Sequence, residues 1–218
     1  MLLTGRRLLS RSPFRFDFRS HSGTPLSDPS MWLREWGDDF PKEKYPPLDH
    51  FLREPASLTP EDFEYLGRWK DGALKGEKKW KPNVASVAFP IWMQAAHELP
   101  GTRIEHLEVP GFLAEWSAKT YADEFSSRTV QKRLGLVRAT TILHLLSRGT
   151  YPIFDSRVRR AFRRLTGDKA YDRVDWYLGS YLPFFSQLIS ECRTDDKKAV
   201  DNALFMYGRK RPYFTNVP

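Results

Sequence analysis

The sequence predicts an all-α fold, a compact multi-helix domain, from two observations on its hydrophobic pattern. Ser156–Leu165 carries apolar residues at the spacing i, i+3, i+4 and i+7, which gathers them on one face of a helix. Those residues are Val158, Ala161, Phe162 and Leu165. No segment shows sustained alternation of apolar and polar residues between turns, so the sequence predicts no β-sheet.

Capping residues and helix-breaking residues predict where the other helices begin and end. One helix should begin at Thr59, which can cap it, with Pro60 suited to the first helical position. Pro90 should limit or bend the following helix, and Gly167 should end the arginine-rich helix. The remaining predicted helices are Val84–Glu98, Gly111–Phe125, two helices that meet at Gly135 within Arg128–Ser147, Tyr177–Cys192, and Asp196–Tyr207, which Gly208 should close.

The chain is predicted to have three parts. A flexible, basic and Pro-rich extension covers residues 1–57, the helical domain covers residues 58–210, and a short tail covers residues 211–218. Residues 1–25 hold five arginines, one acid and several serines, a composition typical of mitochondrial transit peptides. A disordered extension, or a start codon assigned too far upstream, explains the same composition, and we favour that interpretation.

Charge is concentrated in one segment. The chain carries a formal net charge of +8 and a sequence pI near 9.6. Residues 126–169 alone carry eleven basic and two acidic side chains, so the rest of the chain is close to neutral. Concentrated positive charge attracts polyanions, because neutralised phosphates release their counterions. A helix face that is merely solvated explains the same pattern.

Several classes of protein are disfavoured by what the sequence lacks. The five histidines are scattered without metal-ligand spacing, and there is no glycine-rich phosphate loop, so we expect no metal and no cofactor. No apolar run approaches the roughly 20 residues of a membrane-spanning helix, so we expect no membrane contact. The lone cysteine, Cys192, fits a reducing compartment such as the cytoplasm. His144 lies in an apolar stretch, where a packed histidine is the expected role.

Asp155 is the acid that opens the arginine-rich helix. It has two explanations. Asp155 or Ser156 can cap the helix, because the first backbone N–H groups of a helix lack partners. Alternatively, Asp155 is a carboxylate held in a positive groove, where it acts on bound nucleic acid.

The order of these motifs resembles the helix-hairpin-helix DNA glycosylase superfamily. Members carry a Gly-containing hairpin before a buried helix, and the matching stretch here is Leu134-Gly135-Leu136-Val137-Arg138-Ala139. They then carry an Asp–Ser/Thr–x–Val–x–Arg pattern, matched by Asp155-Ser156-Arg157-Val158-Arg159-Arg160. Phe63–Lys70 and Asp201–Gly208 are similar to segments of bacterial relatives in the same superfamily, so the likeness covers about residues 58–210.

The resemblance implies a fold and an activity. It implies a helical glycosylase-like domain that acts in base excision repair. Such an enzyme is a hydrolase that cleaves the N-glycosidic bond of a damaged base, and Asp155 would be its catalytic carboxylate. Arg138 or Ala139 stands near the place of the Schiff-base lysine of bifunctional members, so the implied enzyme is monofunctional. Val137 stands where the hairpin normally has a second glycine, which makes close approach to a phosphate less easy.

We therefore expect a monomeric protein that binds duplex DNA through phosphates and that associates with the nucleoid. The candidate DNA contacts are Lys132, Arg133, Gly135, Arg138, Arg157, Arg159 and Arg160. Because the last three lie opposite the apolar face of their helix, the fold should tolerate their reversal to glutamate. Two alternatives stay open: a nucleic-acid-binding module without catalysis on the same fold, and a structural or protein-interaction domain whose arginines pair with acidic partners.

Overall fold

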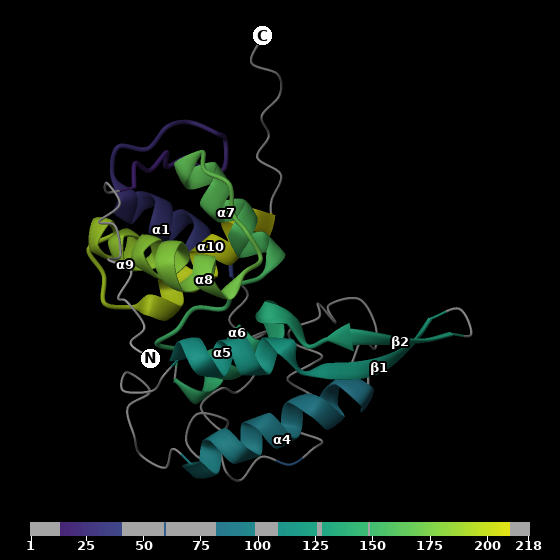
Figure 1. Ribbon diagram of the computed structural model, residues 1–218. Helices are drawn as coiled ribbons and strands as arrows, with labels where there is room; N and C mark the ends of the chain where they lie inside the picture. The colour runs from purple at the N-terminus through teal and green to yellow at the C-terminus, as the bar shows by residue number, and fades with distance from the viewer. Residues whose placement is uncertain are drawn as a thin grey trace, which may run out of the picture. The chain divides into compact units, whose positions relative to one another are not determined.

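The computed structural model describes residues 14–40, 59, 82–98, 109–125, 128–147 and 149–209. This part of the chain is mostly helical, which confirms the mainly α character (Figure 1). The chain divides into two compact units: unit 1 combines Met1–Gly37 with Ser156–Pro218, and unit 2 is Asp38–Asp155. None of the described helices is long and apolar enough to cross a membrane. The predicted helix that begins at Thr59 lies outside the described residues, except for Thr59 itself, which is exposed.

Unit 1 contains the arginine-rich helix. Its elements are α1 (Pro29–Gly37), α7 (Ser156–Thr166), α8 (Val174–Trp176), a π-helical turn η4 (Tyr177–Tyr181), α9 (Leu182–Glu191) and α10 (Lys197–Arg209). The predicted face of α7 is confirmed, because Val158, Ala161, Phe162 and Leu165 are all buried. Gly167 ends α7 as predicted: it has φ +74°, and its N–H donates to the carbonyl of Arg163 at 2.9 Å.

The N-terminal segment differs from the expectation of a flexible extension. Residues 14–37 are part of unit 1, where Phe18, Trp32 and Trp36 are buried. The side-chain amide of Gln187 on α9 accepts from the N–H of Phe14 at 2.8 Å and donates to its carbonyl at 2.9 Å. The N–H of Asp17 donates to the carbonyl of Leu165 at 2.7 Å. We call residues 14–28 the N-terminal strap, since they cross the helices of unit 1.

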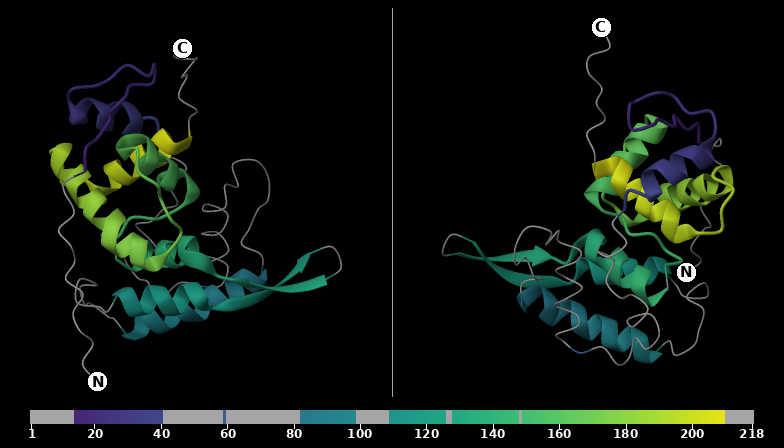
Figure 2. Two further views of the ribbon diagram at one scale, coloured as in Figure 1. Left: turned by 45° about the horizontal axis from the view of Figure 1, so that its top comes forward. Right: turned by 180° about the vertical axis from the view of Figure 1, so that it is seen from behind.

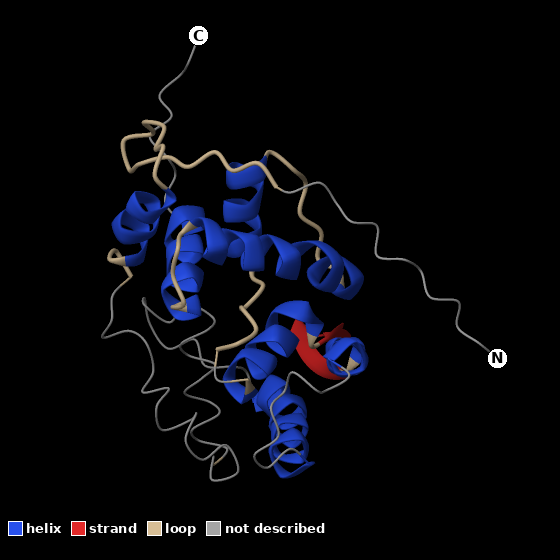
Figure 3. Ribbon diagram, turned by 90° about the vertical axis from the view of Figure 1, so that its left-hand side faces the viewer, coloured by secondary structure: helices blue, strands red, loops and turns tan. Residues whose placement is uncertain are grey.

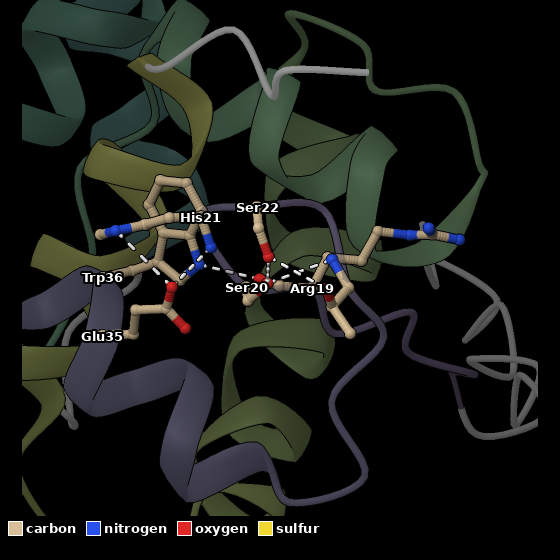
Figure 4. Close-up of polar contacts among 7 residues, drawn as sticks. Arg19, Ser20, His21, Ser22, Glu35 and Trp36 are labelled. Carbon is tan, nitrogen blue, oxygen red and sulfur yellow. Dashed lines mark hydrogen bonds and ion pairs between the residues drawn. The ribbon is translucent and has the colours of Figure 1, made fainter. Parts of the chain in front are cut away.

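A local network holds the turn of the strap against α1 (Figure 4). The indole N–H of Trp36 donates to the carbonyl of Arg19 at 2.9 Å, and the backbone N–H of His21 donates to the carboxylate of Glu35 at 2.5 Å. The His21 ring meets the Trp36 ring edge-on, with 4.1 Å between centroids. Asp28 accepts from the hydroxyl of Ser30 at 2.8 Å and, as a cap of α1, from the N–H of Ser30 at 2.9 Å, and these two hydrogen bonds lower the pKa of the Asp28 carboxyl.

Aromatic rings form the core of unit 1. Phe162 of α7 packs edge-on against Phe184 of α9 and against Trp176, with centroids 4.7 and 4.9 Å apart. The strap adds Phe14, whose ring lies 5.9 Å from Phe162 and 5.7 Å from Phe184. Such pairs stabilise a core beyond the area they bury. The strap is therefore a structural part of this core, and the physical cause is its phenylalanines, which the arginine-rich composition conceals.

The helix predicted over Tyr177–Cys192 is present but is not regular. Its first part is the π-helical turn η4, and α9 follows directly at Leu182. Pro183 has no N–H and cannot donate to the carbonyl four residues earlier, which accounts for a widened turn just before it. α9 ends at Glu191, and its C-cap Cys192 is buried, which raises the pKa of the thiol to about 12.

The last helix corrects one expectation. α10 continues through Gly208 to Arg209, so Gly208 does not close it. A Cβ atom placed on Gly208 would lie 1.9 Å from the carbonyl oxygen of Arg157 and 2.5 Å from its carbonyl carbon. Gly208 is required for the close approach of α10 to α7 rather than for a turn. At the other end, Asp196 caps α10 by accepting from the N–H of Ala199 at 2.9 Å.

Unit 2 holds the largest correction to the predicted secondary structure. Its elements are α4 (Pro82–Glu98), α5 (Val109–Ala118), β1 (Thr120–Phe125), β2 (Arg128–Arg133) and α6 (Gly135–Leu146). The expected helix Gly111–Phe125 ends at Ala118, and β1 and β2 form an antiparallel hairpin that pairs Thr120 with Arg133 and Phe125 with Arg128. In both views of Figure 2 the hairpin reaches past α4, and Figure 3 shows its strands in red among helices.

The prediction of no sheet was wrong, because the described side chains of the hairpin do not alternate between buried and exposed. Tyr121 is buried, whereas Ala122 and residues 129–133 are exposed. A helix expected just before Gly135 is thus a strand, so two helices do not meet there. The core of unit 2 lies among its helices instead, where Trp92 of α4 and Trp116 of α5 are buried. α4 includes Pro90 in its interior and continues beyond it.

Candidate nucleic-acid interface

Asp155 follows a stretch of chain that is firmly held along α6. Ile153 and Phe154 are buried, and the N–H of Phe154 donates to the hydroxyl of Thr140 at 3.1 Å. That hydroxyl in turn donates to the carbonyl of Val137 at 3.1 Å. Asp155 comes next, half-buried, as the last residue of unit 2 and the residue before α7. A catalytic carboxylate needs a fixed backbone of this kind, and so does a helix cap.

The turn before this stretch explains the role of His144. His144 is buried on α6, and its Nδ1 lies 2.8 Å from the carbonyl oxygen of Tyr151. Since a carbonyl only accepts, Nδ1 carries the proton. The hydroxyl of Ser147 accepts from the N–H of Tyr151 at 3.1 Å, and Gly149 supplies the positive φ, +83°, that the turn requires. His144 is thus a packed residue that shapes the turn leading to Asp155.

Three of the α7 arginines form an inner row that contacts α10. Arg157, Arg160 and Arg164 follow the spacing i, i+3, i+7, and we call them the inner row. The guanidinium of Arg157 lies 4.4 Å from the centroid of the Phe205 ring. Arg160 Nη1 donates to the carbonyl of Gly208 at 2.9 Å, and Arg164 Nη1 donates to the carbonyl of Tyr207.

The inner row therefore stabilises unit 1. Carbonyls in the last turn of a helix lack intrahelical donors and carry partial negative charge, so cations there are favourable. Burial lowers the pKa of Arg164 and raises the pKa of Tyr207 to about 12, and both shifts follow from the packing of this contact. Contrary to the expectation from the sequence, we predict that reversal of Arg157 and Arg160 destabilises unit 1, because a glutamate there would face these same carbonyls and Phe205.

Two arginines form an outer row. Arg159 and Arg163 lie four residues apart on α7, and we call them the outer row. Arg159 Nη1 lies 3.1 Å from the carboxylate of Asp172, in the loop that follows α7, and its side chain is 25% exposed. Arg163 is exposed. Arg163 is not among the candidates taken from the sequence, because the helical spacing does not show which arginines α10 contacts.

The remaining candidates belong to unit 2. Lys132 and Arg133 are exposed on β2. Gly135 opens α6 with φ +81°, a conformation that favours glycine, and a Cβ there would meet no atom within 4 Å. Arg138 lies over the Tyr121 ring at 5.7 Å, and its Nη1 donates to the carbonyl of Leu134 at 3.1 Å. Arg138 thus joins α6 to the hairpin within unit 2.

The candidate residues therefore separate into two groups, one in each unit. Asp155 and the four candidates of unit 2 belong to the middle of the chain, whereas Arg157, Arg159 and Arg160 belong to unit 1. The described residues contain no group of three or more histidine, cysteine, aspartate or glutamate side chains that could hold a metal ion. No protein-family model matches the chain, and no curated protein or solved structure matches it either.

Proposed function

We propose that this protein binds DNA through the outer row of α7, with Arg160 beside it. The observation that supports this proposal is the charge of α7. The helix has five arginines and no acidic residue, and Arg160 and Arg163 are exposed. Arg160 is exposed and is held by its bond to Gly208, so little conformational entropy opposes its binding to a phosphate. In this proposal the protein is a monomer that works in the cytoplasm, at the nucleoid.

The salt dependence of DNA affinity tests this proposal. Arg163→Gln should lower the slope of log affinity against log salt by about 1, because one fewer counterion is released. Lys197→Gln removes the same charge from the start of α10, at the end opposite Gly208, and should leave the slope unchanged. Fluorescence anisotropy with a labelled duplex at several salt concentrations measures both variants. Equal slopes for the wild type and Arg163→Gln would contradict the proposed surface.

The finer proposal is that the chain is a divergent relative of the helix-hairpin-helix DNA glycosylases, with Asp155 as the catalytic carboxylate. It rests on the pattern from Asp155 to Arg160 and on the fixed backbone before Asp155. The Gly-containing hairpin of the family joins two helices, but here a strand, β2, precedes Gly135, so this part of the motif does not support the proposal. A carboxylate beside the sugar would stabilise the positive charge that develops as the base leaves.

Replacement of Asp155 separates catalysis from capping. Asp155→Asn keeps the shape and can still cap α7, so it should preserve stability while lowering base release about 100-fold or more. Asp155→Ala should in addition cost about 1 kcal/mol of stability if the residue caps the helix. Free base released from a panel of damaged duplexes is the measurement. If the wild type releases none, or if the Asn variant releases as much, the non-catalytic binding module is the better description.

A further inference from the structure

Tyr171 is an exposed aromatic residue on a rigid support. It lies in the loop between α7 and α8, and at 50% it is the most exposed of the three exposed large hydrophobic residues among the described residues. Its ring meets Trp176 at an interplanar angle of 69°, with 6.4 Å between centroids. Trp176 is itself buried and packs edge-on against Phe162 of α7. One side of Tyr171 is therefore held by the core, and the other is open to solvent.

The same loop is tied to the outer row of α7. Asp172, the neighbour of Tyr171, forms the ion pair with Arg159. Arg163 stands one helical turn beyond Arg159 on the same side of α7. Tyr171 is thus the neighbour in the chain of Asp172, which Arg159 binds. Its ring also contacts Trp176, which packs against α7, the helix that carries Arg159 and Arg163. The nearby Arg173 and Asp175 pair with each other and leave little net charge.

We propose that Tyr171 is a stacking platform for an unpaired nucleobase whose neighbouring phosphates contact Arg159 and Arg163. Aromatic side chains next to a positive surface bind single-stranded nucleic acid in this way, because every base has a face that can stack. A duplex keeps its bases inside the helix and offers Tyr171 no such face. This inference rests on the proposed function, since it assigns unpaired bases as ligands of the same α7 surface.

Two replacements of Tyr171 distinguish stacking from other roles. Tyr171→Phe keeps the ring and should bind a single-stranded oligonucleotide within about twofold of the wild type, whereas Tyr171→Ala should bind it about tenfold more weakly. Met31→Ala, which removes another exposed apolar side chain of unit 1, should have no effect. Because Tyr171 is exposed, thermal unfolding of all three variants should match the wild type.

The choice of ligand completes the experiment. Duplex of the same sequence and an oligomer of abasic sugar phosphates should bind the wild type and Tyr171→Ala equally, because neither presents a free base. Equal single-strand affinity of the wild type and Tyr171→Ala overturns the inference but leaves the proposed DNA surface standing. An equal loss with all three ligands also overturns it, since the ring would then act without stacking. A wild type that binds none of them overturns the proposed function as well.

Discussion

Replacing Gly208 with alanine is expected to destabilise unit 1 by about 3 kcal/mol, because the new methyl group has no space. Its Cβ would lie 1.9 Å from a backbone oxygen of α7, and a backbone cannot move aside as the end of a flexible side chain can. To relieve the clash, α10 must shift away from α7. The shift would also weaken the hydrogen bonds from Arg160 and Arg164 to the last turn of α10. Urea unfolding followed by tryptophan fluorescence measures the loss.

Gly179 provides the matched control for this replacement. It lies in the helical segment η4 of the same unit, and a Cβ placed there meets no atom within 4 Å. Gly179→Ala should therefore be neutral or stabilise the protein by up to about 1 kcal/mol, since alanine is the better helix former. If Gly208→Ala and Gly179→Ala unfold at the same urea concentration, α10 does not approach α7 as closely as described.

The second large effect concerns Trp32 in the N-terminal segment. Trp32→Ala should cost about 4 kcal/mol, because it empties a fully buried site between Phe18 and Tyr207. The ring centroids of Trp32 lie 5.6 Å from Phe18 and 5.7 Å from Tyr207, so the loss reaches both the strap and α10. The midpoint of thermal unfolding, compared with that of the wild type, gives the effect.

Replacement of the neighbouring residue Met31 is the control for Trp32→Ala. It precedes Trp32 on α1 but is 47% exposed, so Met31→Ala should change stability by less than about 0.5 kcal/mol. A flexible N-terminal extension, the organisation expected from composition, predicts no effect from either replacement. Unchanged unfolding of Trp32→Ala would therefore restore that expectation and remove the strap from the core of unit 1.

The parts of the fold that could be predicted are those in which local pattern and tertiary packing agree. α7 shows this most clearly, because its apolar positions repeat at the helical period and Gly167 stands where a left-handed residue is needed. The hairpin could not be predicted in this way, since Tyr121 is buried while most of its neighbours are exposed. The strap was missed for a related reason: its arginines determine the composition, but its phenylalanines determine the packing.

The candidate site could be predicted only as a list of charges. Helical spacing placed the arginines of α7 opposite its apolar face, but it did not predict that α10 would contact the inner row. That division depends on Phe205, Tyr207 and Gly208, which lie more than 40 residues further along the chain. The exposure of Tyr171 could not be predicted either, because the local sequence does not show that only Trp176 of this ring pair is buried. Only Asp155 stood out by its position, and the structure adds the hydrogen bond at Phe154 that holds the chain before it.

Unit 1 is built from both ends of the chain, and this has a consequence for its synthesis on the ribosome. Phe14 bonds to Gln187 across 173 residues, so the strap and α1 emerge long before α7, α9 and α10 exist. Until then Trp32 and Trp36 lack their ring partner Tyr207 of α10, and the nascent chain presents these apolar rings to its surroundings. Unit 2, in contrast, is contiguous and can begin to fold as soon as it has emerged. The order of folding therefore differs from the order of synthesis: α1 is made before unit 2, but its rings are buried only after α10 has been made.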